Sequence, residues 1–470
     1  MIKKLFSAYR LCRTVLTAHP RLVLVLNLAV LFVLFDLVSL RRLDMDFGWH
    51  LQTGNYIRTH GIPVHDIFTY TAQQFPWIDH EWGNDVIVSW LYGLGGYPLL
   101  AALYAMLWSA GLVIAGVRVR LSVLLLAAFA LFPYAGIRPI AWTVFFLAVA
   151  LRLLRSKQQR IVWLLPLLFI PWANLHAGFV SALALIAYIG WYERRPALFG
   201  VCVLSALATL INAYGPRLYV EIARTLFDPA LHSQVGEWRS FYFKLSGLLF
   251  IAMWGAGGIL MEKRTFKAWL RPSVPLLLAA MSATRNMPLF VVVSVRELGG
   301  YADGALAMVR AGGPVPYLRQ IKAGTTLVAY GVLVYLVWQT FWPLNASRLA
   351  DYPQAAVAYL QTNGCEGGNV FNDYNYGGYL TWKLPGQLVY IDGRMPSWKA
   401  PDGQKYMTKY YNLLSHPAGY QKPFVRYNIR CALLQHNQLD AGLTSRLLQG
   451  QWRPVADNKT YILLLAPTSK

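Results

Sequence analysis

The sequence predicts an all-α membrane bundle of about eleven transmembrane helices, followed by a small external α/β domain. Composition is the first observation behind this prediction. Of the 470 residues, 56% are hydrophobic and only 14% are charged, whereas about a quarter of the residues in an average soluble domain are charged. The second observation is spacing, because the apolar residues form separated runs, and a helix needs roughly 17–25 residues to cross a bilayer.

The first run, at 22–40, follows a basic N-terminal segment that lacks a small-residue cleavage site. We therefore expect an uncleaved first helix with its N-terminus in the cytoplasm. The predicted bundle occupies residues 1–344. Its later runs lie at 98–117, 121–135, 139–154, 161–172, 178–192, 197–213, 243–261, 273–283, 287–299 and 323–343.

A formal net charge of +22 would suggest nucleic-acid binding in a soluble protein. Here the basic clusters fall in the connections that eleven alternating crossings place in the cytoplasm, where Lys and Arg accumulate in membrane proteins. We therefore predict no nucleic-acid partner. The same topology puts a long loop, residues 41–97, and the C-terminal region on the outer face.

Residues 345–470 have the mixed composition of a water-soluble chain, and we expect one external α/β domain there. Its predicted helix spans 354–363. The predicted strands are 369–373, 388–392, 429–435 and 460–466. Cys365 and Cys431 both fall in this domain and would form a disulfide in an oxidising compartment if their Cα atoms come within about 7 Å.

The outer loop carries an unusual density of polar and aromatic side chains. Asp44 and Asp46 follow the first apolar run two residues apart, a spacing that lets one carboxylate act as a general base while the other orients it or holds a cation. A partly desolvated carboxylate has its pKa raised toward the range of a useful base. The same loop contributes further candidate binding residues, namely Trp49, His50, Asp79, His80 and Glu81.

Arg138, His176 and Arg285 are each expected at an outer helix end, where they would stabilise the negative charge of a lipid phosphate. Glu237, in the motif VGEW, is a further candidate. Other interpretations stand beside these: the arginines could be interfacial snorkelling residues, and His176 could cap a helix. The tryptophans could form an aromatic belt rather than stack on a sugar ring.

The acidic pair after the first helix, the multi-helix body and the external C-terminal domain together resemble the GT-C superfamily of membrane glycosyltransferases. The motifs DFGWHLQTGNYIRTHGIPVHDIFTYTAQQFPWIDHEW, PWANLHAGF and INAYGPRLY resemble a poorly characterised bacterial branch near that superfamily. The resemblance implies a polyprenyl-phosphate-linked sugar as donor. It also implies an acidic base in the first outer loop, either Asp44 or Asp46, and Asp44 is preferred because it is closer to the helix end.

The segment NDYNYGGYL is faintly similar to an acceptor-recognition motif of oligosaccharyltransferase catalytic subunits. The match implies an acceptor role for Asp373 and Tyr374, although the paired tryptophans of that motif are absent. Asp392 and Arg394, in the stretch IDGR, could form either a salt-bridged turn or part of a binding site.

These features predict an inverting GT-C-type glycosyltransferase of a bacterial inner membrane, with its C-terminal domain in the periplasm or outside the cell. It would move a sugar from a polyprenyl-phosphate carrier to an envelope glycan or lipid. The alternatives are a lipid-linked glycan transporter or flippase, for which we see no symmetric halves, and a non-catalytic assembly scaffold. No cofactor is identified, and a divalent metal at Asp44 and Asp46 stays open because spacing cannot show convergent ligands.

Overall fold

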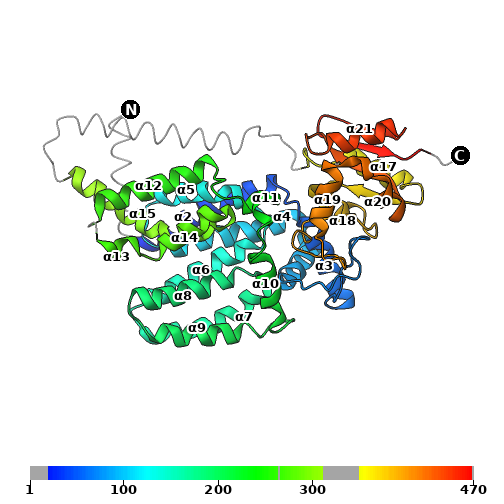
Figure 1. Cartoon of the computed structure of the whole chain (residues 1–470). Coiled ribbons are helices and arrows are strands. Elements are labelled where there is room, and N and C mark those ends of the chain that lie inside the picture. Colours follow the sequence, from blue (N-terminus) through cyan, green and yellow to red (C-terminus); the bar gives the residue numbers. More distant parts are fainter. Residues whose placement is uncertain (1–18, 263–264, 311–348, 468–470) are drawn as a thin grey trace, which may run out of the picture.

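The computed structural model describes residues 19–262, 265–310 and 349–467. Figure 1 shows a helical body and, at one end of it, a smaller region that contains the only sheet of the described residues. Helix α3 (Phe47–His60) lies between the two and packs against α4 (Trp82–Ala115) of the body and α18 (Gly377–Lys383) of the smaller region. The long outer loop therefore joins the two parts.

The helices of the body coincide with the apolar runs of the sequence. Each predicted run between residues 22 and 299 falls on a helix, while the run at 323–343 lies outside the described residues. The remaining helices of the body are α2 (Pro20–Arg41), α5 (Leu121–Leu131), α6 (Ile140–Leu154), α7 (Leu165–Leu175), α8 (Phe179–Tyr192), α9 (Ala197–Ala208), α10 (Arg217–Leu226), α11 (Leu231–Gln234), α12 (Leu245–Met261), α13 (Phe266–Trp269), α14 (Ser273–Ser282) and α15 (Met287–Arg310).

Two helices of the described residues, α2 and α4, are both long and apolar enough to cross a membrane, and several shorter apolar helices have 10–17 residues. Helix α2 buries one stripe that includes Leu31, Phe35 and Val38. Its other faces expose apolar side chains such as Val25 and Val33. A single buried stripe with apolar side chains around it suits a helix that packs on a bundle and faces lipid. The count of eleven crossings stays a prediction.

Helix α4 begins well before the apolar run at 98–117 that predicted it. It breaks at Gly96, whose φ of 64° is accessible mainly to glycine, and Pro98 follows the break. The first part of α4 therefore belongs to the predicted outer loop. This part carries Asp85, which contacts His50 of α3.

The smaller region contains a four-stranded sheet in the order β1-β2-β4-β3, in which β1 and β2 are parallel and the other pairs antiparallel. The strands are β1 (Asn369–Asn372), β2 (Ile429–Gln435), β3 (Arg453–Asp457) and β4 (Tyr461–Leu465). Alternate side chains enter two cores, because successive residues of a strand point to opposite faces. Leu433 packs with α17 (Gln354–Asn363), while Leu434 packs with α19 (Tyr406–Ser415).

The predicted helix at 354–363 is confirmed, and three of the predicted strands lie on β1, β2 and β4. The predicted strand at 388–392 is wrong, since only Val389 forms a bridge, with Thr69 of the outer loop. The buried Asn372 side chain takes the place of a strand partner there. Its amide bonds the Ile391 carbonyl and its carbonyl accepts from the Tyr390 N–H, both at 2.8 Å. Strand β3 was not predicted, because residues 453–457 combine Arg, Pro and Asp and lack apolar alternation.

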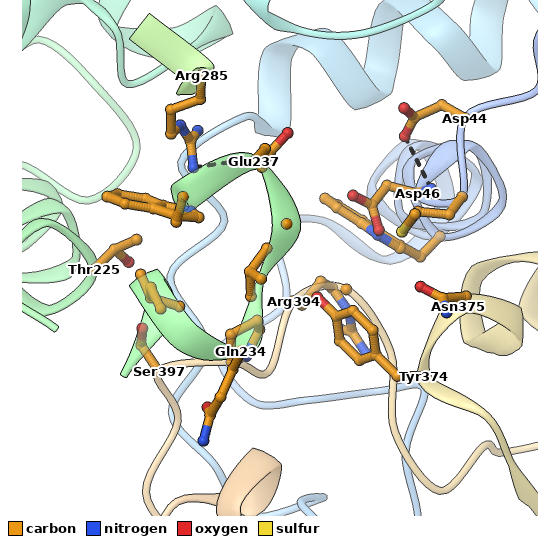
Figure 2. Close-up of a pocket in the computed structure, with 18 of the residues that line it drawn as sticks. Asp44, Asp46, Thr225, Gln234, Glu237, Arg285, Tyr374, Asn375, Arg394 and Ser397 are labelled. Carbon is orange, nitrogen blue, oxygen red and sulfur yellow. Dashed lines mark hydrogen bonds and ion pairs between the residues drawn. The ribbon is translucent and has the colours of Figure 1, made fainter. Parts of the chain in front are cut away.

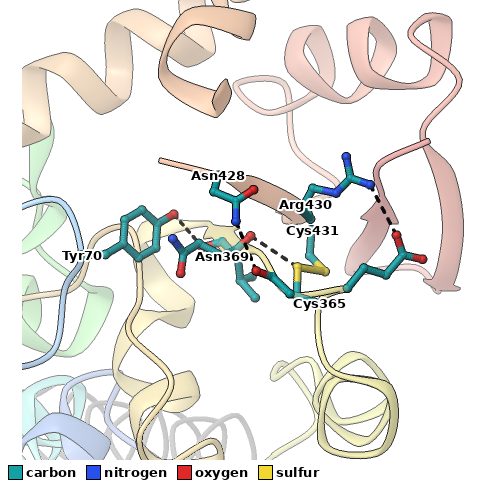
Figure 3. Close-up of a disulfide and its surroundings, with 9 residues drawn as sticks. Tyr70, Cys365, Asn369, Asn428, Arg430 and Cys431 are labelled. Carbon is teal, nitrogen blue, oxygen red and sulfur yellow. Dashed lines mark hydrogen bonds and ion pairs between the residues drawn. A yellow bond between two sulfur atoms is a disulfide. The ribbon is translucent and has the colours of Figure 1, made fainter. Parts of the chain in front are cut away.

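Cys365 and Cys431 form a disulfide with a Cα–Cα distance of 5.7 Å (Figure 3). Cys365 lies just after α17 and Cys431 lies within β2, so the bond fastens this helix to the centre of the sheet. Because the two cysteines are 66 residues apart, closing this loop in the unfolded chain corresponds to about 4 kcal/mol in the chain-entropy description.

The outer loop and the smaller region approach each other through glycines. A Cβ on Gly48 of α3 would lie 1.8 Å from the carbonyl oxygen of Gly378, and a Cβ on Gly378 would lie 2.1 Å from that of Met45. No larger residue fits at either position without displacing backbone. The crossing of α3 over α18 therefore fixes the start of the outer loop, which carries Asp44 and Asp46, against the smaller region.

Candidate functional site

A cavity of about 570 Å³ lies where the helical body, the outer loop and the smaller region meet (Figure 2). This volume is within the range of ligand sites, roughly 300–1,000 Å³. Every residue that the sequence singled out as catalytic or substrate-binding lines this one cavity, although the residues come from segments far apart in the chain. They are Asp44, Asp46, Trp49, His50, Asp79, His80, Glu81, Arg138, His176, Glu237, Arg285, Asp373 and Tyr374.

One wall carries a chain of alternating charges. Arg138 contacts Asp44 at 2.7 Å and Glu237 at 2.8 Å, and Arg285 contacts Glu237 at 3.4 Å. Figure 2 shows Arg285 and Glu237 joined on this wall. The Arg285 guanidinium also lies over the Trp238 ring, 4.5 Å from its centroid. Burial alone would raise the pKa of Glu237, but the two guanidinium groups outweigh it and lower that pKa to about 2. Glu237 is therefore ionised at neutral pH.

Asp46 is partly buried and makes no ion pair among the described residues. One of its carboxylate oxygens accepts a hydrogen bond from the Trp49 indole at 2.9 Å, and its backbone N–H donates to Asp44 at 3.0 Å. A Cβ on Gly393 would lie 1.8 Å from the same Asp46 oxygen. Burial and the neighbouring Asp44 carboxylate raise the pKa of Asp46 to about 7. A carboxylate with this pKa can take up a proton near neutral pH.

Glu81 lies at the centre of three histidines. Its carboxylate oxygens are 3.7 Å from Nε2 of His50, 3.6 Å from Nε2 of His80 and 3.5 Å from Nε2 of His176. Burial, with the Asp85 and Asp79 carboxyl groups adding to it, raises the pKa of Glu81 to about 8. Burial and the charge of Arg285 lower the pKa of His80 to about 4. Glu81 and His80 are therefore largely uncharged at neutral pH.

Two of these histidines are held by their Nδ1 atoms. The Gly178 N–H donates to Nδ1 of His176 at 3.0 Å, which leaves the proton of the neutral ring on Nε2, facing Glu81. Thr143 also contacts this Nδ1, at 2.6 Å. Nδ1 of His50 lies 2.5 Å from Asp85, which fixes the orientation of that ring. His176 thus offers an N–H donor at the cavity.

The smaller region provides the third wall. Asp373 accepts hydrogen bonds from the Asn375 N–H at 2.8 Å and the Tyr410 hydroxyl at 3.0 Å. Both of its oxygens therefore have partners, and Asp373 holds the short turn at Tyr374–Tyr376. Of the pair predicted from the faint acceptor motif, Asp373 positions the turn, whereas Tyr374 and Asn375 present their side chains at the cavity.

Arg394 forms a buried ion cluster that the sequence predicted only in part. Its guanidinium contacts Asp392 at 2.6 Å, as in the salt-bridged turn, and also Asp66 of the outer loop at 2.8 Å. Four aromatic rings lie within 6.0 Å of it, from Trp49, Phe68, Trp77 and Trp398. The tryptophans of the outer loop were visible in the sequence. Their contact with Arg394 was not, because Arg394 lies far along the chain in the C-terminal region.

The described residues contain no group of three or more His, Cys, Asp or Glu side chains arranged to hold a metal ion. Asp44 is engaged by Arg138 and Asp46 by Trp49, so the two carboxylates do not converge on a common point as cation ligands do. The sequence left a divalent metal at this pair open, and the arrangement of the two carboxylates does not fit one.

No known protein-family model and no curated protein matches this chain. Solved structures do. The Archaeoglobus fulgidus oligosaccharyltransferase, tethered with an acceptor peptide containing the NVT sequon, superposes with a TM-score of 0.55 at 11% identity, over 87% of this chain and 69% of that chain. Its apo form gives 0.54 at 11% identity over the same shares. This chain is similar in fold to an archaeal oligosaccharyltransferase.

The archaeal oligosaccharyltransferase AglB from Archaeoglobus fulgidus, in complex with an inhibitory peptide and a dolichol-phosphate, gives a TM-score of 0.50 at 12% identity, again over 87% and 69% of the two chains. At these identities the likeness concerns the fold. The GT-C superfamily and its bacterial branch stay predictions.

Proposed function

We propose that this protein is a membrane glycosyltransferase that transfers a sugar from a polyprenyl-phosphate carrier to a hydroxyl group of an envelope glycan or lipid. The observation that carries the proposal is the Asp46 carboxylate, whose pKa is raised to about 7, in one cavity with two guanidinium groups. A proton acceptor and cations in one cavity are what this transfer requires. The oligosaccharyltransferase-like fold supports the proposal.

Asp46 is the base in this proposal, in preference to Asp44. Asp44 contacts Arg138 at 2.7 Å and accepts the Asp46 N–H, so its negative charge orients these two neighbours. Asp46 has no cation partner among the described residues and only the Trp49 indole as side-chain donor. Its pKa, raised to about 7, makes Asp46 a proton acceptor near neutral pH.

The transfer proceeds in one displacement. The acceptor O–H bond breaks and its proton moves to Asp46, while the acceptor oxygen forms a bond to the anomeric carbon. The bond from that carbon to the phosphate oxygen breaks, and its electron pair leaves with the carrier phosphate. Attack opposite the leaving group inverts the anomeric configuration. No proton donor for the leaving phosphate is required.

Arg285 is the first contact for the departing phosphate. Its ion pair with Glu237 is the longest of this chain of charges, 3.4 Å, and its side chain is 31% exposed. Arg138 and the Nε2–H of His176 provide further donors at the same cavity. Preorganised donors of this kind stabilise charge as it develops on the leaving group.

The proposed location is the outer face of a bacterial inner membrane, with the N-terminus in the cytoplasm and the smaller region in the periplasm or outside the cell. A disulfide in that region, between Cys365 and Cys431, suits an oxidising compartment. The donor sugar would then be presented on the outer leaflet. Membrane lipids border the helical body.

The test is Asp46→Asn in the full-length protein, compared with Asp351→Asn, a change at an exposed position away from the cavity. We expect Asp46→Asn to lower transfer by about 10²–10⁴-fold, the usual contribution of a general base, without loss of folding. Cells with this variant should accumulate the lipid-linked sugar and lack one envelope glycan.

Unchanged envelope glycans in cells carrying Asp46→Asn would contradict the proposal and favour a scaffold. Accumulation of the lipid-linked sugar on the cytoplasmic leaflet would favour a flippase. The leaflet is measured by access of an external sugar-oxidising reagent to intact spheroplasts.

A further inference from the structure

A second cavity, of about 340 Å³, lies in the smaller region and shares no lining residue with the first. It is formed between α19 and α20 (Gln421–Arg426), with one contribution from the outer loop at Thr71. Its volume falls within the range of small-ligand sites. The side chains that characterise it are Tyr406, Lys409, His416, Lys422, Arg426 and Tyr427.

The lining of this second cavity has an excess of positive charge. It includes Lys409, Lys422 and Arg426 but no Asp or Glu. Lys409 pairs with Asp402 at 2.6 Å, outside the lining. Within the part of the chain that the structure describes, neither Lys422 nor Arg426 forms an ion pair with a carboxylate. Both residues are exposed, so an anionic ligand that enters the cavity can reach them and form charge-assisted hydrogen bonds.

Aromatic rings accompany these cations. Tyr427 packs edge-on to Tyr390 at 6.2 Å, and the Arg426 guanidinium lies 5.3 Å from the centroid of the Tyr427 ring. Gln404 and Asn412 add hydrogen-bonding groups to the lining. Flat apolar rings beside amide and cationic donors suit a saccharide, which offers C–H faces and many hydroxyl groups, better than a bare inorganic ion.

Helix α19 separates the two cavities. Tyr410 and Tyr411 line the candidate catalytic cavity, whereas Tyr406, Lys409 and Leu413 line the second one. A helix with its side chains is roughly 10–12 Å across. One chain-like ligand that crosses α19 can therefore occupy both cavities.

We propose that the second cavity binds an acidic saccharide, one that carries carboxylate groups, as a distal segment of the acceptor glycan. The acceptor assignment rests on the proposed transferase function, whereas the ligand chemistry rests on the cavity alone. A membrane headgroup is disfavoured, because α20 lies on the side of the smaller region that faces away from the helical body (Figure 1).

The test measures binding to the full-length protein in detergent by isothermal titration calorimetry. The probes are a short oligogalacturonate and a neutral oligoglucan of equal length. We expect the oligogalacturonate to bind more tightly. The variant Lys422→Ala/Arg426→Ala should weaken its binding about tenfold or more, because two charge-assisted contacts are lost.

The matched control is Arg453→Ala/Lys459→Ala, which removes the same charge from exposed positions outside the cavity of the same region. It should bind the oligogalacturonate as the wild type does. Equal affinity for the neutral probe, equal loss in the control, or wild-type affinity in Lys422→Ala/Arg426→Ala would each overturn the proposal. Displacement of the oligogalacturonate by inorganic phosphate at equal concentration would also overturn it.

Asp46→Asn separates this proposal from the transferase function. It should retain oligogalacturonate binding while it loses transfer, because Asp46 does not line the second cavity. Oligogalacturonate binding by a wild-type protein that itself shows no transfer would reject the enzyme and keep the acidic-saccharide site.

Discussion

Two arginine-centred ion clusters face the same cavity and differ sharply in burial. Arg394, Asp66 and Asp392 have side chains that are 2%, 0% and 0% exposed. Arg138, Glu237 and Arg285 have side chains that are 26%, 31% and 31% exposed. The chemistry of the pairs is alike, so burial determines what each cluster does.

A buried arginine between two carboxylates has no water to replace a lost partner, so the cluster holds the outer loop against the smaller region. The half-buried cluster of Arg138, Glu237 and Arg285 can exchange its partners with water or with a ligand, and each of its pairs contributes less to stability than a fully buried pair. The first cluster therefore sets the shape of the cavity, and the second can accept a phosphate. Substitutions in the two clusters should separate stability from transfer.

The largest expected effect is that of Arg394→Met. It leaves the Asp66 and Asp392 carboxylates buried without a cation, which typically costs about 3–5 kcal/mol. Thermal unfolding in detergent should show a markedly lower midpoint, and limited proteolysis should cleave the outer loop. Transfer should also be lost, because Gly393 and Asp46 are in close contact beside this cluster.

The triple variant Asp66→Asn/Asp392→Asn/Arg394→Met removes the unpaired charges and should regain part of the lost stability. A wild-type unfolding midpoint in Arg394→Met would contradict the assigned role of the buried cluster. Arg453→Met, at an exposed position on β3, controls for the substitution itself.

Arg285→Met should have the opposite profile. Glu237 keeps its 2.8 Å contact with Arg138, so we expect a change in stability of no more than about 1 kcal/mol. Transfer should fall about 10²–10³-fold, the usual effect of removing one group that stabilises developing charge. A loss of stability as large as that of Arg394→Met, with transfer retained, would show that the two clusters do not differ in function.

The sequence predicted the residues of the half-buried cluster and the pair Asp44 and Asp46 as site residues. Arg138 and Arg285 stood out because charged residues at outer helix ends are costly unless they are paired or used. Asp44 stood out by its spacing from Asp46, and Glu237 by the motif VGEW. Alternating membrane crossings placed them on one face, and the structure brings them to one cavity. What the sequence could not supply is the pairing, because an ion pair depends on distances between segments far apart in the chain.

The buried cluster was harder to predict for the same reason. The turn formed by Asp392 and Arg394 was one of two interpretations of a local motif. Asp66 lies in another segment, and its contact with Arg394 depends on how α3 crosses α18 at Gly48 and Gly378. The preference between Asp44 and Asp46 also depended on the tertiary structure, because the Arg138 contact with Asp44 decides it.

Gly393→Ala tests the close contact between Asp46 and Gly393, the neighbour of Arg394 in the chain. The new Cβ would lie 1.8 Å from the Asp46 oxygen, so the carboxylate has to move. A displacement of about 1 Å at a catalytic group costs on the order of 10²-fold in rate, and we expect a loss of transfer of that size with a smaller change in the unfolding midpoint. Gly442→Ala is the matched control, since a Cβ there meets only ordinary contacts at 3.5 Å or more. Equal transfer rates in the two variants would remove Gly393 from the site.

The smallest expected effect is the pH dependence of kcat/KM and of stability. It distinguishes the carboxylates of Glu237 and Asp46, which line the same cavity. With its pKa near 2, Glu237 stays ionised across the neutral range, and its contribution to stability is lost only as pH falls from its ordinary pKa of 4.5 toward 2. The pKa of Asp46 is raised from 3.8 to about 7. The value of kcat/KM should therefore rise with pH through about 7 and fall about tenfold for each pH unit below it.

The stability contributed by Asp46 should fall, rather than rise, as pH increases from 3.8 through about 7. Between pH 3.8 and about 7 the folded protein holds an Asp46 proton that the unfolded chain has released. This group therefore stabilises the fold fully below pH 3.8, and the contribution is lost as pH rises through 7. Asp46→Asn should abolish both the rise in kcat/KM and this part of the fall in unfolding midpoint. A rise in kcat/KM that persists in Asp46→Asn, or that has its midpoint near pH 4, would assign the base to another group.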